Sequence, residues 1–245
     1  MSHKVTIQKG AFIISDAHFS SSRPELFSFI EEIFLEKLQP PQLILMGDIF
    51  DALFGSIEYT YKKNQKMIDM LNAIAQKTEV IYLEGNHDFN LKAVFHTMKI
   101  FTISQQPVAC QYKDKKVYLA HGDFEGPLGY RIYSALIRNP FVLPVLKMVD
   151  NLTKHSILNY VDSHLGEKED CNEFTGFKNF IAKRIENSYS CDYFIEGHYH
   201  QNKQIDLKNC IYINLAAFAC NQRYFTVKSL EDKEILEENI FSKGE

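Results

Sequence analysis

One design, repeated five times along the chain, constrains the fold most: a short apolar stretch that ends in Asp, Asn or His. The apolar stretches 11–15, 43–46, 80–83, 116–120 and 191–195 are followed by Asp16-Ala17-His18, Gly47-Asp48, Gly85-Asn86-His87-Asp88, His121-Gly122-Asp123 and Gly197-His198-Tyr199-His200. Short continuous apolar runs are typical of buried strands. In an α/β layout the carboxyl ends of such strands are where ligands bind. The pattern therefore predicts one site built from five strand ends.

The segments between these groups predict the fold class. Apolar residues at helical spacing predict helices over 25–38, 61–76 and 173–187, so the first half reads strand, helix, strand, helix, strand. The last third reads as short antiparallel strands over 204–207, 210–215, 223–228 and 234–236. We expect an α/β (α+β) fold, with two mixed sheets in a sandwich and helices outside, forming one domain over residues 1–245.

Residues 126–170 differ in character and predict a helical insertion that caps this domain. The segment combines many large apolar residues with a few cations, and Pro140 and Pro144 divide it. Two interpretations stay open. The insertion is either a helical hairpin packed on the domain for stability, or a lid whose apolar face accepts acyl chains while arginines hold phosphate or meet an anionic membrane. For the second, Tyr130, Arg131 and Arg138 are the expected substrate contacts.

Composition narrows the partners and the compartment. The net charge is −4 and no dense basic stretch is present, so nucleic acid is not expected as a partner. The five cysteines are odd in number, widely spaced and never in a CxxC pair, which favours reduced thiols in a cytoplasmic protein over a disulfide framework. No signal-type segment and no apolar run long enough to span a bilayer is evident.

The side chains at the strand ends are suited to a pair of divalent metals. Carboxylate, amide and imidazole donors without thiolate favour Mn²⁺, Fe²⁺ or Zn²⁺ over Ca²⁺. Taken singly, each group also occurs as a turn or cap at a strand end, but five together favour a binding site. The expected ligands are Asp16, His18, Asp48, Asn86, His121, His198 and His200. Seven donors suit two metals that share a carboxylate, and such a pair hydrolyses phosphate esters or anhydrides.

These groups resemble, in the same order, the five motifs of the calcineurin-like metallophosphoesterases. The resemblance implies a four-layer α/β/β/α sandwich and a metal pair, Mn²⁺ first and Fe²⁺, Zn²⁺ or Mg²⁺ as alternatives. It places one metal on Asp16, His18, Asp48 and His200, and the other on Asp48, Asn86, His121 and His198. His87 would stabilise the phosphoryl group or protonate the leaving oxygen, with Asp88 orienting its ring. Asp51 and Asp123 would support the ligands or serve as plain turn residues.

One branch of that family is especially similar, the UDP-2,3-diacylglucosamine pyrophosphohydrolases of lipid A biosynthesis. The shared features are Asp88-Phe89, a Tyr within ten residues of His121-Gly122-Asp123, and a basic, proline-containing insertion. The resemblance implies cleavage of an acylated UDP-sugar to UMP and a sugar 1-phosphate, at the cytoplasmic face of the inner membrane. His87 departs from the pattern, because the best-known members carry Arg there. A soluble phosphodiester or nucleotide substrate, and a metal-free scaffold, are the alternatives.

Overall fold

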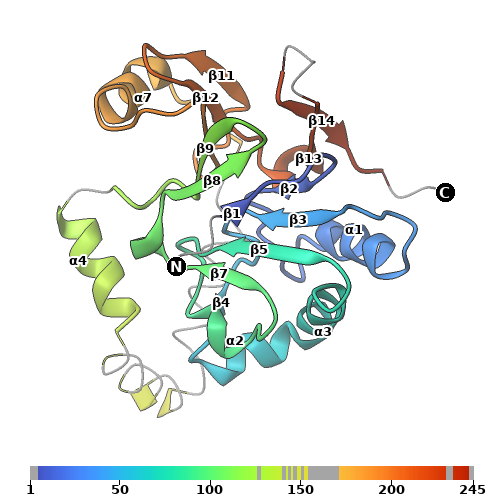
Figure 1. Ribbon diagram of the computed structural model, residues 1–245. Coiled ribbons are helices and arrows are strands. Elements are labelled where there is room, and N and C mark those ends of the chain that lie inside the picture. The colour runs from blue at the N-terminus through green and yellow to red at the C-terminus, as the bar shows by residue number, and fades with distance from the viewer. Residues whose placement is uncertain are drawn as a thin grey trace.

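Two six-stranded mixed sheets form the centre of the computed structural model (Figure 1). It describes residues 5–125, 128–139, 142, 145, 148–149, 152–153, 171–229 and 234–242. The strands of the first sheet are β2 (Phe12–Ile14), β3 (Gln42–Leu45), β5 (Glu79–Leu83), β7 (Lys99–Phe101), β13 (Arg223–Val227) and β14 (Leu236–Ile240). Those of the second are β1 (Val5–Thr6), β8 (Val108–Tyr112), β9 (Lys115–Ala120), β10 (Tyr193–Glu196), β11 (Lys203–Asp206) and β12 (Ile211–Asn214).

The strand order brings the predicted motif ends together within each sheet. The first sheet runs β14-β13-β2-β3-β5-β7 and the second runs β1-β8-β9-β10-β12-β11. Strands β2, β3, β5 and β7 are parallel, as are β9, β10 and β12, so their carboxyl ends share an edge. The expected run of antiparallel strands after His200 is only partly right. Strand β12 pairs antiparallel with β11 but parallel with β10, which buries it inside the second sheet.

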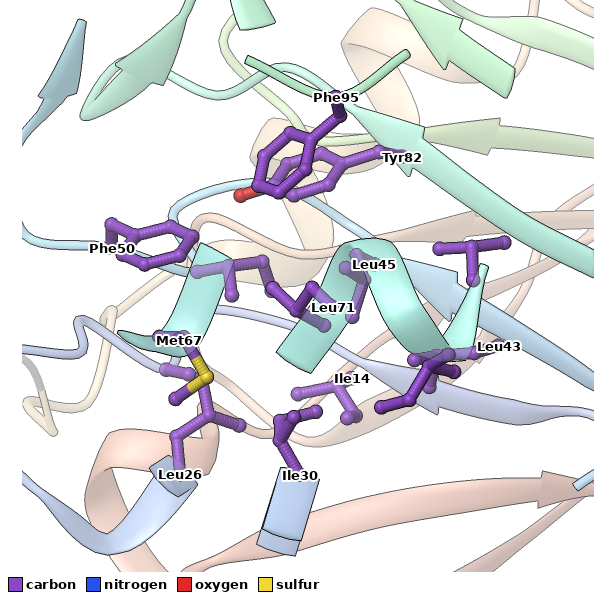
Figure 2. Close-up of a cluster of buried hydrophobic side chains, with 14 of the residues drawn as sticks. Ile14, Leu26, Ile30, Leu43, Leu45, Phe50, Met67, Leu71, Tyr82 and Phe95 are labelled. Atoms are coloured by element: carbon purple, nitrogen blue, oxygen red, sulfur yellow. The ribbon is translucent and has the colours of Figure 1, made fainter. Parts of the chain in front are cut away.

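Alternating apolar residues build the predicted four layers. On β2, Ile14 packs with residues of α1 (Glu25–Phe34) and α3 (Gln65–Ile74), whereas Ile13 packs between the sheets. Figure 2 shows the first of these clusters, where Leu26 and Ile30 of α1 and Met67 and Leu71 of α3 meet the sheet. Each such buried side chain stabilises the fold by about 1.5–3 kcal/mol. Helix α7 (Phe177–Ile185) covers the second sheet, which completes the α/β/β/α sandwich.

The second predicted helix, 61–76, is divided in the structure. Helix α2 (Glu58–Lys63) ends at Asn64 and α3 begins at Gln65. The Asn64 amide donates to the Thr60 carbonyl at 2.9 Å, and this local side-chain bond competes with a continuous helix. Strands β4 (Leu53–Phe54) and β6 (Asp88–Phe89) form a separate parallel pair beside these helices.

Most of the predicted insertion at 126–170 lies outside the described residues. Its described helix is α4 (Leu128–Ile137), which stands apart from both sheets in Figure 1. Tyr130 and Arg131 fall on α4, but their side chains lie outside the described part. Ile132 and Leu136 are 53% and 50% exposed, so α4 presents apolar side chains to its surroundings.

The expectation that all cysteines are reduced is wrong for one pair. Cys171, directly after the insertion, forms a disulfide with Cys220 on the short helix α8 (Phe218–Asn221). The two residues are 49 positions apart, a spacing that carries no recognisable pattern, and only the fold brings them together. Cys110, Cys191 and Cys210 are free thiols.

Candidate metal centre

The structure brings all seven expected ligands to one end of the sandwich, where the two sheets meet. The first sheet supplies the ligands that follow β2, β3 and β5, and the second sheet supplies those that follow β9 and β10. Asp16, Asp48 and His121 are almost fully buried, whereas His198 and His200 are partly exposed at the rim. The centre is therefore anchored in the interior and open on one side.

The ligand atoms fall into two main groups. Those of Asp16, His18 and His200 lie within 4.8 Å of one another, and so do those of Asp48, His121 and His198. Nε2 of His121 lies 3.3 Å from Asp48 Oδ2 and 3.3 Å from Asn86 Oδ1, which adds the amide to the second group. The resemblance implies two ligand sets with Asp48 in both, whereas here the atoms of a third group, His18, Asp51 and His87, also lie within 4.8 Å of one another.

Most of these residues adopt a left-handed backbone conformation and not an extended one, and this conformation sets the direction of their side chains. Five ligands have φ between 46° and 63°, a region that non-glycine residues seldom adopt, and they are Asp16, His18, Asp48, His198 and His200. Residues i and i+2 of extended chain would point the same way. Here His198 and His200 turn to different groups. Such conformations persist only where the surroundings enforce them, and they are typical of functional sites.

Gly85 and Gly197 are required by close approach. A Cβ on Gly85 would lie 2.2 Å from Asp48 Oδ1, and one on Gly197 would lie 2.0 Å from Ser15 Oγ and 2.6 Å from Asp16 Oδ2. Gly197 therefore provides room for the Asp16 carboxylate. Both glycines let the strand ends approach closely enough for the ligands to meet.

The donor set fits divalent metal ions. Oδ1 of Asp16 is buried and lies 3.0 Å from Nε2 of His200, so the two side chains converge on one point. Burial raises the pKa of Asp16, but the nearby His200 imidazole more than offsets this and lowers the pKa below its ordinary value. Burial lowers the pKa of His198 to about 4. Both side chains thus offer lone pairs at neutral pH.

His87 lies beside the ligand groups, with its ring fixed by the main chain. Its Nδ1 is 2.9 Å from the carbonyl of Asp51, and because a carbonyl only accepts, Nδ1 carries a hydrogen. Nε2 then faces inward, 3.9 Å from Asp48 Oδ2. The expected orienting role of Asp88 is wrong, because the Asp51 carbonyl makes that contact.

Asp88 instead holds the loop that carries the shared ligand. Its carboxylate accepts from the main-chain N–H of Asp48 at 3.0 Å and of Ile49 at 2.7 Å, and from the Tyr82 hydroxyl at 2.5 Å. Side chains that bind several N–H groups of one loop restrict its conformation. The fully buried Asp88 carboxylate therefore positions Asp48 from the interior of the protein, not from the solvent-exposed side of the centre.

Three further predicted residues lie at the edge of the centre. The Asp51 carboxylate is 3.2 Å from His18 Nδ1, a position from which it orients that ring. Arg138 of the insertion donates to the Gly85 carbonyl at 2.8 Å, stacks 4.7 Å above the Phe89 ring, and lies 3.8 Å from Asp123. Arg138 thus fastens the end of α4 to the loop of Asn86.

A buried ion pair behind the second group was not anticipated. Arg184 of α7 donates to both Glu196 carboxylate oxygens at 2.8 and 2.5 Å, and to the Gly122 carbonyl at 3.2 Å. Burial raises the pKa of Glu196, and the Arg184 guanidinium opposes the rise. Gly122 adjoins His121, and Glu196 precedes the loop of His198. The signal available in the sequence was a glutamate at the end of an apolar stretch, which the structure buries completely.

Taken together, the fold and this site define a class: a two-sheet α/β hydrolase that binds divalent metals with Asp, Asn and His at strand ends. The chain belongs to the calcineurin-like phosphoesterases, whose family model matches residues 11–202. It is a metal-dependent hydrolase of phosphate esters or anhydrides.

Known relatives and structures are similar at low identity. The chain is 23% identical over 194 residues to the UDP-2,3-diacylglucosamine hydrolase of Pseudomonas fluorescens SBW25, with 77% of this chain and 78% of that protein covered. It is 28% identical over 134 residues to the protein of that name from Coxiella burnetii RSA 493, with 53% and 54% covered. A solved archaeal phosphodiesterase aligns with a TM-score of 0.45 at 14% identity, with 94% of this chain and 99% of that chain covered.

Proposed function

We propose that the protein hydrolyses the pyrophosphate of UDP-2,3-diacylglucosamine to UMP and 2,3-diacylglucosamine 1-phosphate, a step of lipid A synthesis. The observation that carries the proposal is the match, over 77% of the chain, to a relative of that name. The relatives' acylated substrate also suits the helix α4, which is joined to the Asn86 loop through Arg138 and presents exposed Ile132 and Leu136.

The proposed ligands are Asp16, His18, Asp48 and His200 for one metal, and Asp48, Asn86, His121 and His198 for the other. We propose Mn²⁺ as the ion at both positions, since the donors mix oxygen and imidazole nitrogen. When bound, such a pair of ions activates water and neutralises charge on the phosphoryl oxygens.

His87 is proposed as the proton donor or cation that faces the phosphoryl group. Because Nδ1 is committed to the Asp51 carbonyl, Nε2 carries a proton only when the ring is an imidazolium. In that form Nε2 donates to an oxygen of the substrate, and loss of its proton to the leaving oxygen completes bond cleavage. The main chain of Asp51 keeps the ring in the orientation that this transfer needs.

The exposed apolar residues of α4 also support a place at the cytoplasmic surface of the inner membrane, where an acylated substrate resides. Within the described part of the chain, no helix is long and apolar enough to cross a bilayer. Membrane contact through α4 is therefore proposed as peripheral, with the lipid chains of the substrate reached from the surface.

The decisive test is UMP release from UDP-2,3-diacylglucosamine with Mn²⁺ in mild detergent, alongside soluble nucleotide sugars and bis-p-nitrophenyl phosphate. We expect fast turnover of the acylated substrate, and its loss in Asp16→Ala and His121→Ala. Asp69→Ala, which alters an exposed aspartate of α3, is the matched control and should keep full activity. Turnover confined to the soluble compounds would replace the lipid substrate with a soluble phosphodiester or nucleotide, and full activity in Asp16→Ala would refute the ligand assignment.

A further inference from the structure

A groove lies between the start of α7 and the start of β11, two elements that are labelled at the top of Figure 1. Its volume is about 700 Å³. The lining joins an aromatic floor to exposed polar side chains, and includes Phe174, Phe177, Lys178, Asn202, Lys203 and Gln204. No residue of this groove belongs to the metal centre described above.

Aromatic rings gather at and beside this groove: Phe174 and Phe177 line it, and Phe180 adjoins Phe174 outside the lining. Phe174 and Phe180 are each 37% exposed, and their ring centroids are 5.2 Å apart. Phe177 lies beneath Phe174 at 5.5 Å and is buried. Exposing two neighbouring phenylalanines costs hydrophobic free energy, and a stable ring surface of this kind is a platform on which a flat ligand stacks.

The platform is continuous with the metal centre through Tyr199, which separates the ligands His198 and His200 in sequence. The Tyr199 ring lies 5.0 Å from the His198 ring, 5.5 Å from Phe180 and 6.3 Å from Phe174. One aromatic ring thus lies between the exposed phenylalanines and a metal ligand. A ligand that stacks on Phe174 therefore lies one aromatic ring away from the loop that carries His198 and His200.

Gln201 holds the platform in place. It follows His200, and its side chain accepts from the Phe174 main-chain N–H at 2.8 Å and donates to the Asn172 carbonyl at 2.9 Å. Its own main-chain N–H is anchored by Asn214 at 2.7 Å. Groups that are fixed before a ligand arrives lose little conformational entropy on binding. The platform and the His200 loop are therefore one preorganised unit.

The opposite wall of the groove is polar and exposed. Gln204 presents an exposed amide, which pairs with the hydrogen-bonding edge of a nucleobase, whereas the Asn202 amide already donates to Glu238 at 2.9 Å. On the aromatic side, Lys178 of α7 adds a cation. An acyl chain would gain nothing from such a wall. A different cavity of about 420 Å³ lies on the α4 side, with Arg138 and Ala135 in its lining. That second cavity reaches the edge of the metal centre at Asp123.

We propose that the groove between α7 and β11 binds the nucleobase of a nucleotide whose phosphate lies at the metal centre, with Phe174 as the stacking surface. The proposal rests on the proposed function in one respect: it assigns the uridine half of the substrate to this groove. It predicts that the product UMP is held by its base as well as by its phosphate.

The test compares equilibrium binding of UMP and ribose 5-phosphate to the full chain with Mn²⁺, because ribose 5-phosphate lacks the base. Wild type should bind UMP more tightly. Phe174→Ala should weaken UMP binding about tenfold and leave ribose 5-phosphate within twofold, whereas Phe174→Trp should keep the preference. Phe34→Ala, at an exposed phenylalanine of α1 that lines a separate cavity, is the matched control and should behave as wild type.

Equal affinity of wild type for the two ligands, or an unchanged UMP affinity in a folded Phe174→Ala protein, would overturn the assignment. Failure of the proposed function looks different. A protein that releases no UMP from the acylated substrate, but loses its preference for UMP in Phe174→Ala, keeps the nucleobase groove and loses only the lipid substrate.

Discussion

At the scale of single residues, His87 depends on one hydrogen bond to the Asp51 carbonyl, which dictates where its second proton sits. We expect His87→Gln to lower kcat by about 10²–10⁴-fold, the usual contribution of a positioned acid or base, with bound metal unchanged. His96→Gln, which alters an exposed histidine outside the motifs, should have no effect. Steady-state kinetics and metal analysis of both variants measure the difference.

His87→Arg separates the two roles proposed for this ring. Arginine keeps a positive charge but does not release its proton, so activity near wild type would assign charge stabilisation to position 87. Activity as low as that of His87→Gln would assign proton transfer. Activity of His87→Gln at the wild-type level would remove His87 from the reaction altogether.

Residue types at the strand ends could be predicted from sequence because metal chemistry demands particular donors. Their conformations could not. The left-handed φ of Asp16, Asp48 and His198 depends on packing against other strand ends, which no local pattern encodes. The role of Asp88 was likewise hidden, because its partners on the Asp48 loop are about 40 residues away.

At the scale of secondary-structure elements, we expect α7 to support the second group of ligands through the contacts of Arg184 with Glu196 and Gly122. Arg184→Met should weaken binding of one Mn²⁺ by about 10–100-fold, the usual effect of losing a partner behind a metal ligand, and leave the other near wild type. Manganese titration of the folded protein distinguishes the two sites. Arg223→Met is the matched control, because its partner Glu238 lies on β14.

Breaking a buried ion pair also costs about 3–5 kcal/mol of stability, because Glu196 would be left as an unpaired charge. The double variant Arg184→Met with Glu196→Gln removes that charge and should recover most of the stability. Two manganese sites of wild-type affinity in the folded double variant would contradict a role for α7 in metal binding.

The elements themselves were largely foreseeable. After their polar first residues, Gln42 and Glu79, strands β3 and β5 are apolar because both faces are covered, and α1 and α3 keep helical spacing on one face. The boundaries of the elements were less predictable. Helix α1 ends at Phe34, four residues before the predicted position 38, and the chain turns away at Glu36, which adopts a φ of 60°. The disulfide of Cys171 with Cys220 had no signal in the spacing.

At the scale of the whole molecule, bound metals would join the two sheets. Asp16 and Asp48 extend from the first sheet, and His121, His198 and His200 extend from the second. Saturation at 100 times Kd adds about 2.7 kcal/mol of stability for each site. We therefore expect metal removal by a chelator to lower the Tm by about 5–10 °C for each ion lost, and Mn²⁺ to restore it.

Thermal unfolding of the wild type and of His121→Ala, each with and without Mn²⁺, measures this. The variant should lose most of the metal-dependent shift, while an exposed-site variant such as His96→Gln should show all of it. If the Tm of the wild type were the same with and without Mn²⁺, the centre would not bind these ions in the folded state.

The order of the donors along the chain also bears on when the centre first exists in a cell. Its donors run from Asp16 to His200. At the usual rate of about 5–20 residues per second, a ribosome spends many seconds between the first donor and the last. A nascent chain therefore presents isolated donors long before it presents a site, and assembly of the full centre has to follow synthesis of His200.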